Sequence, residues 1–205
     1  MLRDIWLVHP DPAIGAAFRE RFEGLPRVRV VAAMFQELGP HDCFVTAGNA
    51  FGIMTAGIDA AVVARLGEGL MARVQHRIMD EYWGEQPVGT AFVVPTGDAA
   101  IPWLCHAPTM RVPGSIAGTD KVYCATWAAL LAIAAHNRRG DGPPIEVAAF
   151  PAMGTGFGGV EPGEAARQMA AAYRSFLDPP HRLDWDFVAQ RQRAVCYDGP
   201  RQVIR

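Results

Sequence analysis

The stretch from Val45 to Asp59 contains the side chains with the clearest chemical potential. It reads VTAGNAFGIMTAGID, so small residues surround one amide, Asn49, and one carboxylate, Asp59. Small residues let the backbone approach a ligand closely and direct N–H groups at it. An asparagine side chain both donates and accepts hydrogen bonds, which suits the hydroxyl pair of a ribose. Asp59 lies where a helix is expected to begin, so it either acts on a ligand or only stabilises the helix N-terminus.

A second loop, FPAMGTGFGGV over residues 150–160, has four glycines within six residues and one threonine hydroxyl. Such a loop can form a nest of backbone N–H groups that holds a diphosphate. It has no P-loop lysine for a triphosphate, and it lacks the GxGxxG spacing of a dinucleotide-binding turn. One glycine-rich loop is weak evidence. Two such loops at neighbouring strand ends together predict a phosphate-binding site.

The hydrophobic pattern predicts alternating strands and helices that would position both loops. Strands are expected at 5–9, 28–34, 43–47, 90–95, 103–107 and 146–150, and helices at 12–22, 58–66, 68–82, 123–137 and 162–177. Strands separated by helices of this length imply an α/β fold with a mixed, mostly parallel sheet covered on both faces. Each loop follows a strand and precedes a helix, which is where ligands bind in such folds.

The chain is expected to form one compact domain, residues 1–180, ended by Asp178-Pro179-Pro180. Residues 181–205, with Trp185 and Phe187, are predicted to form a C-terminal helix or arm packed on that domain. Trp83 and Trp103 are large apolar side chains, and we expect both in the core.

Composition excludes several classes of protein. The chain has 205 residues, half of them hydrophobic, and a formal net charge of -2. This balance gives no basic face for general nucleic-acid binding. No apolar run approaches the roughly 20 residues of a membrane span, and the N-terminus does not resemble a signal peptide, so we expect a cytoplasmic protein. The four cysteines are scattered, without a CxxC pair or Cys/His cluster, which predicts buried free thiols, no metal site and no cofactor.

The two loops resemble those of the macro-domain family. The first motif of that family reads roughly VNAAN, followed by a glycine-rich stretch and Val-Asp; here VTAGN is followed by FGIMTAG and Ile58-Asp59. Its second motif reads roughly FPxxxTGxxG, and this chain has FPAMGTGFGG. The similarity covers about residues 28 to 177, and the long stretch 109–123 suggests a bacterial or phage-associated subfamily.

The resemblance implies a three-layer α/β/α macro-domain fold that binds ADP-ribose. Asn49 matches the family's ribose-contacting asparagine, and Asp59 matches the acidic residue near the distal ribose in hydrolytic members. Phe157 takes the place of an aromatic residue that stacks on the distal ribose. The full set of expected ligand-binding residues is Asn49, Phe51, Gly57, Ile58, Met153, Gly154, Thr155, Gly156, Phe157 and Gly158.

Two positions depart from the family pattern. Thr46 replaces the usual first asparagine of the first motif. The family's Gly-Asp-Ile segment, whose aspartate reads the adenine amino group, has no counterpart near Phe35-Gln36-Glu37. Adenine recognition is therefore expected to use other groups, either Phe35 by stacking or Glu37 by hydrogen bonding.

Three functions remain open. The first is de-ADP-ribosylation, in which water attacks the distal ribose with Asn49 and Asp59 as catalytic residues. The second is a non-catalytic module that binds ADP-ribose or a related nucleotide, and the third is a phosphatase acting on ADP-ribose phosphate. The expected partner is ADP-ribose or an ADP-ribosylated macromolecule. His106 is interpreted as a core histidine, with a catalytic base as the alternative; Arg111 is either an exposed arginine or a phosphate contact.

Overall fold

A six-stranded sheet forms the centre of the protein, with the order β2-β1-β6-β3-β5-β4. The computed structural model describes residues 2–140, 142–199 and 201–203. Neighbouring strands run parallel except at the edge, where β4 is antiparallel to β5. This confirms the mixed, mostly parallel sheet. The strands are β1 Asp4–Val8, β2 Val28–Val31, β3 Cys43–Thr46, β4 Phe92–Pro95, β5 Trp103–His106 and β6 Val147–Pro151.

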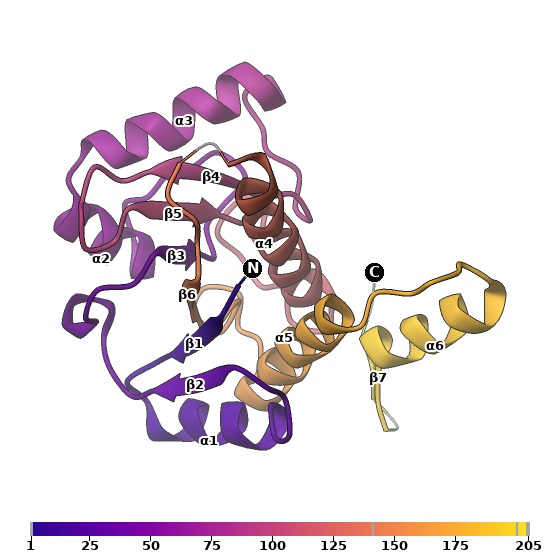
Figure 1. The fold of residues 1–205 in the computed structure, drawn as a ribbon. Coiled ribbons are helices and arrows are strands. Elements are labelled where there is room, and N and C mark those ends of the chain that lie inside the picture. Colours follow the sequence, from indigo (N-terminus) through magenta and orange to yellow (C-terminus); the bar gives the residue numbers. More distant parts are fainter. Residues whose placement is uncertain (1, 141, 200, 204–205) are drawn as a thin grey trace.

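Helices cover both faces of this sheet and complete a three-layer α/β/α fold (Figure 1). Alternation along β3 shows why two layers are needed: Cys43 and Val45 pack into one apolar cluster, and Phe44 between them packs into the other. The first cluster is covered by α1 Pro12–Arg21, α4 Lys121–Arg139 and α5 Pro162–Leu177; the second by α2 Gly57–Leu66, α3 Gly69–Tyr82 and the 3-10 turn η1 Phe35–Glu37.

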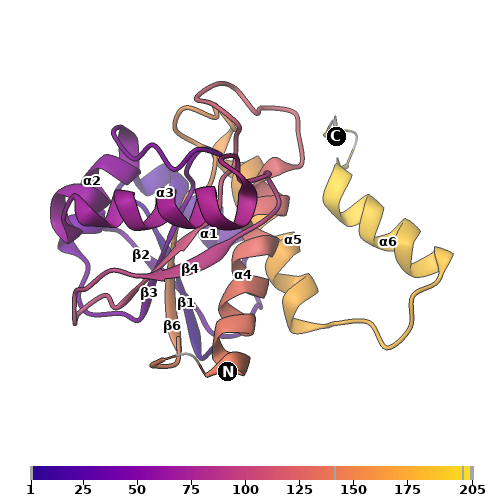
Figure 2. The same cartoon turned by 90° about the horizontal axis from the view of Figure 1, so that it is seen from above.

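The C-terminal segment forms a helix, α6 Trp185–Cys196, followed by a short hairpin of β7 Tyr197–Asp198 and β8 Arg201–Gln202. Figures 1 and 2 show α6 projecting from the body next to α5. Its end is attached through the buried Arg167 guanidinium, which donates to the carbonyl oxygens of Ala194 at 2.8 Å and Val195 at 2.9 Å. The same guanidinium pairs with Glu164, so its charge is compensated.

Trp83 lies at the surface with 94% of its area exposed, so the prediction that it lies in the core is wrong. It ends α3 in the left-handed conformation, with φ of 55°, and this turn directs the ring away from the helix's apolar stripe. Trp103 is half-buried against His136. Cys43, Cys105 and Cys124 are free thiols; Cys43, Cys105 and Cys196 are buried, and Cys124 is half-buried.

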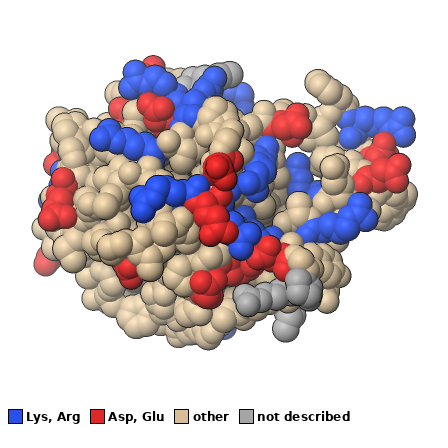
Figure 3. Space-filling model, turned by 90° about the horizontal axis from the view of Figure 1, so that it is seen from below, with Lys and Arg blue, Asp and Glu red and all other residues tan. Residues whose placement is uncertain are grey.

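Basic and acidic side chains are interspersed over the face shown in Figure 3, without a region of one sign. Among the helices that the structure describes, none has the length and apolar character needed to cross a membrane.

Candidate ligand-binding site

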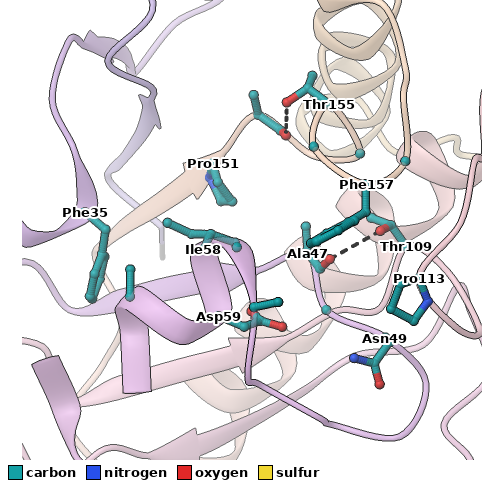
Figure 4. A pocket seen from close by; sticks show the side chains of 18 of the residues that line it. Phe35, Ala47, Asn49, Ile58, Asp59, Thr109, Pro113, Pro151, Thr155 and Phe157 are labelled. Atoms are coloured by element: carbon teal, nitrogen blue, oxygen red, sulfur yellow. Dashed lines mark hydrogen bonds between the residues drawn. The ribbon is translucent and has the colours of Figure 1, made fainter. Parts of the chain in front are cut away.

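A cavity of about 570 Å³ lies at the carboxyl ends of the parallel strands. This volume falls within the range of small-molecule sites. Its wall comes from the segments that follow β1, β2, β3, β5 and β6, so the cavity lies where the sequence predicts a ligand site. Figure 4 shows Phe35 at one end of the cavity, Asn49 and Phe157 at the other, and Ile58 and Asp59 between them.

Both predicted loops line this cavity, and they bring together most of the expected residues. Met153 and Glu37 are not part of the wall. Met153 is fully buried in the core beneath the second loop. Glu37 turns back on its own 3-10 turn, where its carboxylate accepts a 2.7 Å hydrogen bond from the Met34 N–H. The expected residues on the wall are Phe35, Asn49, Phe51, Gly57, Ile58, Asp59, Gly154, Thr155, Gly156, Phe157 and Gly158.

The glycines of the second loop serve different purposes. Gly154 has a φ of 77°, and a Cβ there would lie 2.7 Å from Val122 Cγ2. A Cβ at Gly158 would collide with the Gly154 carbonyl oxygen. A Cβ at Gly156, in contrast, would meet no atom within 4 Å. Gly154 and Gly158 are therefore required by the fold, whereas Gly156 keeps the cavity open.

The backbone of the second loop offers hydrogen-bond donors to the cavity. The Thr155 hydroxyl and N–H both bond to the Ala152 carbonyl oxygen, which fixes the turn (Figure 4). The N–H groups of Gly156, Phe157 and Gly158 donate to no acceptor within the described part of the chain. Unpaired amides on one concave loop form a favourable site for an anion.

Phe157 connects the two loops. Its ring is 62% exposed, and its Cε2 atom lies 3.6 Å from the position that a Cβ would take on Gly57. Gly57 has a φ of 59° and is the first residue of α2. The ring therefore lies across the N-terminus of α2, at the rim of the cavity.

Asn49 uses its side chain to shape the first loop. Its Nδ2 group donates to the Ile53 carbonyl oxygen at 2.8 Å, and its Oδ1 atom accepts from the N–H groups of Phe51 at 3.1 Å and Ile53 at 3.3 Å. The second Nδ2 hydrogen remains for a ligand. The predicted ribose contact is thus limited to one donor, because the other Nδ2 hydrogen and the Oδ1 atom form hydrogen bonds within the loop.

Asp59 lies on the cavity floor in the first turn of α2. No side-chain hydrogen bond caps this helix among the described residues, and Asp59, as the acidic residue of its first turn, also complements the helix dipole. The residue is 6% exposed, and its Oδ1 atom has no hydrogen-bond partner among the described residues. Burial raises its pKa to about 7 because removal from water disfavours the charged form. A carboxyl group that titrates near neutral pH is suited to proton transfer.

The end of the cavity near Phe35 contains groups that the sequence did not predict. Phe35 itself is 2% exposed, because its ring packs on Phe44 at 4.5 Å between centroids and under the Arg65 guanidinium. Gln36 and His9 also line this end. His9 follows β1 and lies outside both loop motifs. Only its position at the end of a strand could have predicted it as a cavity residue.

Arg111 and His106 have structural partners. Arg111 forms a bidentate ion pair with Glu85, with Nε–Oε1 and Nη2–Oε2 distances of 2.6 and 2.8 Å, and its guanidinium lies over the Phe51 ring. His106 is fully buried on β5 behind the cavity wall. Within the described ranges, His, Cys, Asp and Glu side chains form no group of three able to hold a metal ion.

A family model described as Macro domain matches residues 45–169, the part of the chain that contains both loops and most of the sheet. The chain belongs to the macro domain family. An uncharacterized protein of Aquifex aeolicus is 32% identical over 149 residues, which make up 73% of this chain and 82% of that relative.

Solved macrodomain structures show the same fold. One is an Oceanobacillus iheyensis macrodomain mutant with ADPR, at a TM-score of 0.56 and 19% identity over 68% of this chain and 72% of that one. Another is the macrodomain of Mycobacterium tuberculosis DarG, at 0.53 and 21% identity over 66% of this chain and 83% of that one. At these identities the similarity establishes the macro-domain fold, and the site must be argued from this chain's own residues.

Proposed function

We propose that this macro domain binds ADP-ribose and hydrolyses ADP-ribosyl conjugates. The diphosphate would lie between the two loops, where the free N–H groups of Gly156 to Gly158 meet the N-terminus of α2. The distal ribose would lie at the end formed by Asn49 and Phe157, and the adenine at the end formed by Phe35 (Figure 4).

The observation that carries this proposal is the Asp59 carboxyl group on the cavity floor. It is buried, it lacks a hydrogen-bond partner among the described residues, and it does not cap α2. Such a group is costly for the fold, and a role in proton transfer accounts for it. In its ionised form Asp59 would accept a proton from water as the water oxygen bonds to the anomeric carbon of the distal ribose. The bond from that carbon to the conjugated group breaks, and the leaving group takes up a proton.

Adenine would be bound without the aspartate of the family pattern. The buried edge of Phe35 and the apolar side chains of Met34 and Ile58 form an apolar surface at this end. Hydrogen bonds to the base would come from Gln36 and His9. The His9 Nδ1 atom accepts from the Asp11 N–H at 3.0 Å, so in the neutral ring Nε2 carries the hydrogen and can act as a donor.

Two experiments test binding and hydrolysis separately. Calorimetric titration with ADP-ribose, with ADP and AMP as controls, should give micromolar affinity for ADP-ribose and weaker binding of both controls. Release of ADP-ribose from an ADP-ribosylated protein should then follow the amount of enzyme. Binding without release would establish the non-catalytic alternative; absence of ADP-ribose binding would reject the proposed ligand. Release of phosphate from ADP-ribose phosphate would instead favour the phosphatase.

A further inference from the structure

Three buried polar side chains lie near one another behind the cavity floor. They are Thr46, Asp59 and His106, whose atoms Oγ1, Oδ1 and Nε2 have no hydrogen-bond partner in the described part of the chain. Thr46 and His106 have no exposed surface, and Asp59 has 6%. Buried polar groups without partners are rare in folded proteins. Three such side chains, close together and from three different elements, therefore point to a bound group between them.

Gly48 lies against two of these side chains, His106 through Nε2 and Asp59 through Oδ2, the second oxygen of its carboxylate. A Cβ on Gly48 would lie 2.7 Å from His106 Nε2 and 3.1 Å from Asp59 Oδ2, so both atoms border the space where a side chain would be. Thr46 is paired directly with His106 in the register of β3 and β5, which places the two side chains on the same face of the sheet. Gly48 has no left-handed φ, so its neighbours rather than its backbone require a glycine.

Gln86 fixes which nitrogen of His106 carries the hydrogen. Its amide Nε2 group donates to the carbonyl oxygens of Thr90 and His106, at 3.2 and 3.5 Å. Its Oε1 atom, which can only accept, lies 2.6 Å from His106 Nδ1. Nδ1 must therefore donate, and in the neutral ring Nε2 is left as an acceptor only. The pKa of His106 is lowered to about 4 by burial, so the ring is neutral over the physiological range.

His106 Nε2 and the Asp59 carboxylate are then two acceptors that border one space, and only a group with two hydrogens satisfies both. We propose that Thr46, Asp59 and His106 hold one water molecule beside Gly48, and that His106 is a positioning residue that directs this water's second hydrogen to the Asp59 carboxylate. The Thr46 hydroxyl donates to the water oxygen. Three hydrogen bonds are the usual number for a buried water. The role of this water in hydrolysis rests on the proposed function, whereas its presence does not.

The consequence concerns the ionisation of Asp59. A hydrogen bond donated to a carboxylate favours its charged form and lowers its pKa. The water therefore opposes part of the effect of burial and increases the ionised fraction of Asp59 near neutral pH, the form that accepts a proton. Burial is the cause of both pKa shifts, with no contribution from a charged side chain. Arg77 and Tyr82 of α3 are separated from His106 by the Phe92 ring, and Arg65 of α2 is turned to Phe35.

The test is to fill the space with a methyl group. In Gly48→Ala the new Cβ displaces the water, and we expect the Asp59 pKa, followed by carbon-13 NMR of its carboxyl group, to rise by at least about one unit, a tenfold change in the ionisation ratio. The signal is assigned with Asp59→Asn. Gly39→Ala is the matched control, because a Cβ there meets no atom within 4 Å. An unchanged Asp59 pKa in folded Gly48→Ala would overturn the proposal.

Two further variants remove the water's partners without filling the space. Thr46→Val keeps the shape of the side chain and removes the donor, and His106→Phe removes the acceptor. Both should raise the Asp59 pKa, and the pH of half-maximal hydrolysis should rise in step. A purely structural role of His106 would lower the rate equally at every pH and leave the Asp59 pKa unchanged, which would also overturn the proposal. If the wild type hydrolyses nothing, the proposed function fails, and the NMR titration still decides whether the water is there.

Discussion

The two loops of the cavity offer different parts of the chain to a ligand. The loop after β3 presents side chains, the partly engaged amide of Asn49 and the buried carboxyl group of Asp59. The loop after β6 presents its backbone: the N–H groups around Gly156 have no acceptor among the residues that the structure describes, and the Thr155 hydroxyl bonds within its own turn. The backbone N–H donors of a curved loop can hold an anionic group in place. A buried carboxyl group adds a proton acceptor, which binding of the ligand alone does not require. Under the proposed function, the first loop supplies the reacting groups and the second loop anchors the ligand.

The largest expected effect separates these two roles. Asp59→Asn preserves the size of the side chain and removes the proton acceptor, so kcat for release of ADP-ribose should fall by about 10³-fold, within the range of lost general-base catalysis. The Kd for ADP-ribose, measured by calorimetry, should change by less than about threefold. Asp80→Asn on the exposed side of α3 serves as the control. An equal loss of affinity and kcat would show that the first loop also anchors the ligand.

Gly156→Leu tests the second loop. A Cβ at Gly156 meets no atom within 4 Å, so the added side chain has room at the cavity wall, and the Kd for ADP-ribose should rise by about 100-fold, equivalent to ~2.7 kcal/mol. The melting temperature should stay close to that of the wild type. Gly39→Leu places the same side chain in open space elsewhere and should alter neither quantity. Tight binding by Gly156→Leu would exclude this loop as the diphosphate site.

Asn49→Ala should have an intermediate effect, because the amide belongs to the loop as well as to the site. Three hydrogen bonds within residues 49–53 are lost, so we expect about tenfold weaker ADP-ribose binding and a free energy of unfolding lower by ~1 kcal/mol. Calorimetry and chemical denaturation measure the two quantities. If affinity falls while stability does not, the amide contacts the ligand and contributes little to the loop.

The smallest effect is a pH dependence of stability. The folded pKa of Asp59 is raised above its unfolded value of 3.8, to about 7, so between these values the folded state binds more protons than the unfolded state. Stability then falls as pH rises through this window. Between pH 5 and pH 8, the wild type should lose ~1 kcal/mol or more relative to Asp59→Asn in urea denaturation. Parallel pH profiles of the two proteins would mean that the carboxyl group is better solvated than its burial indicates.

Local patterns in the sequence were sufficient for the elements and for the identity of both loops. The helix expected at 162–177 is observed as Pro162–Leu177, and the strand expected at 43–47 as Cys43–Thr46, because proline, glycine and hydrophobic periodicity act within a few residues. The prediction that Trp83 lies in the core was wrong because it relied on this local information alone. Its hydrophobicity suggests burial, but the left-handed turn that ends α3 directs it outward, and that turn is not visible in residue type.

What the sequence by itself determined is which residues lie at the ends of the strands, and hence that Asn49, Asp59 and Gly156 share one cavity. Only the tertiary structure decided what each of them does there. Glu37 and Met153 belong to the right segments but face away from the cavity, because a hydrogen bond to Met34 and packing in the core orient them. The association of Thr46, Asp59 and His106 beside Gly48 depends on the register of β3 with β5 and on the position of α2. Contacts between residues this far apart in the chain are fixed by packing, and no local pattern records them.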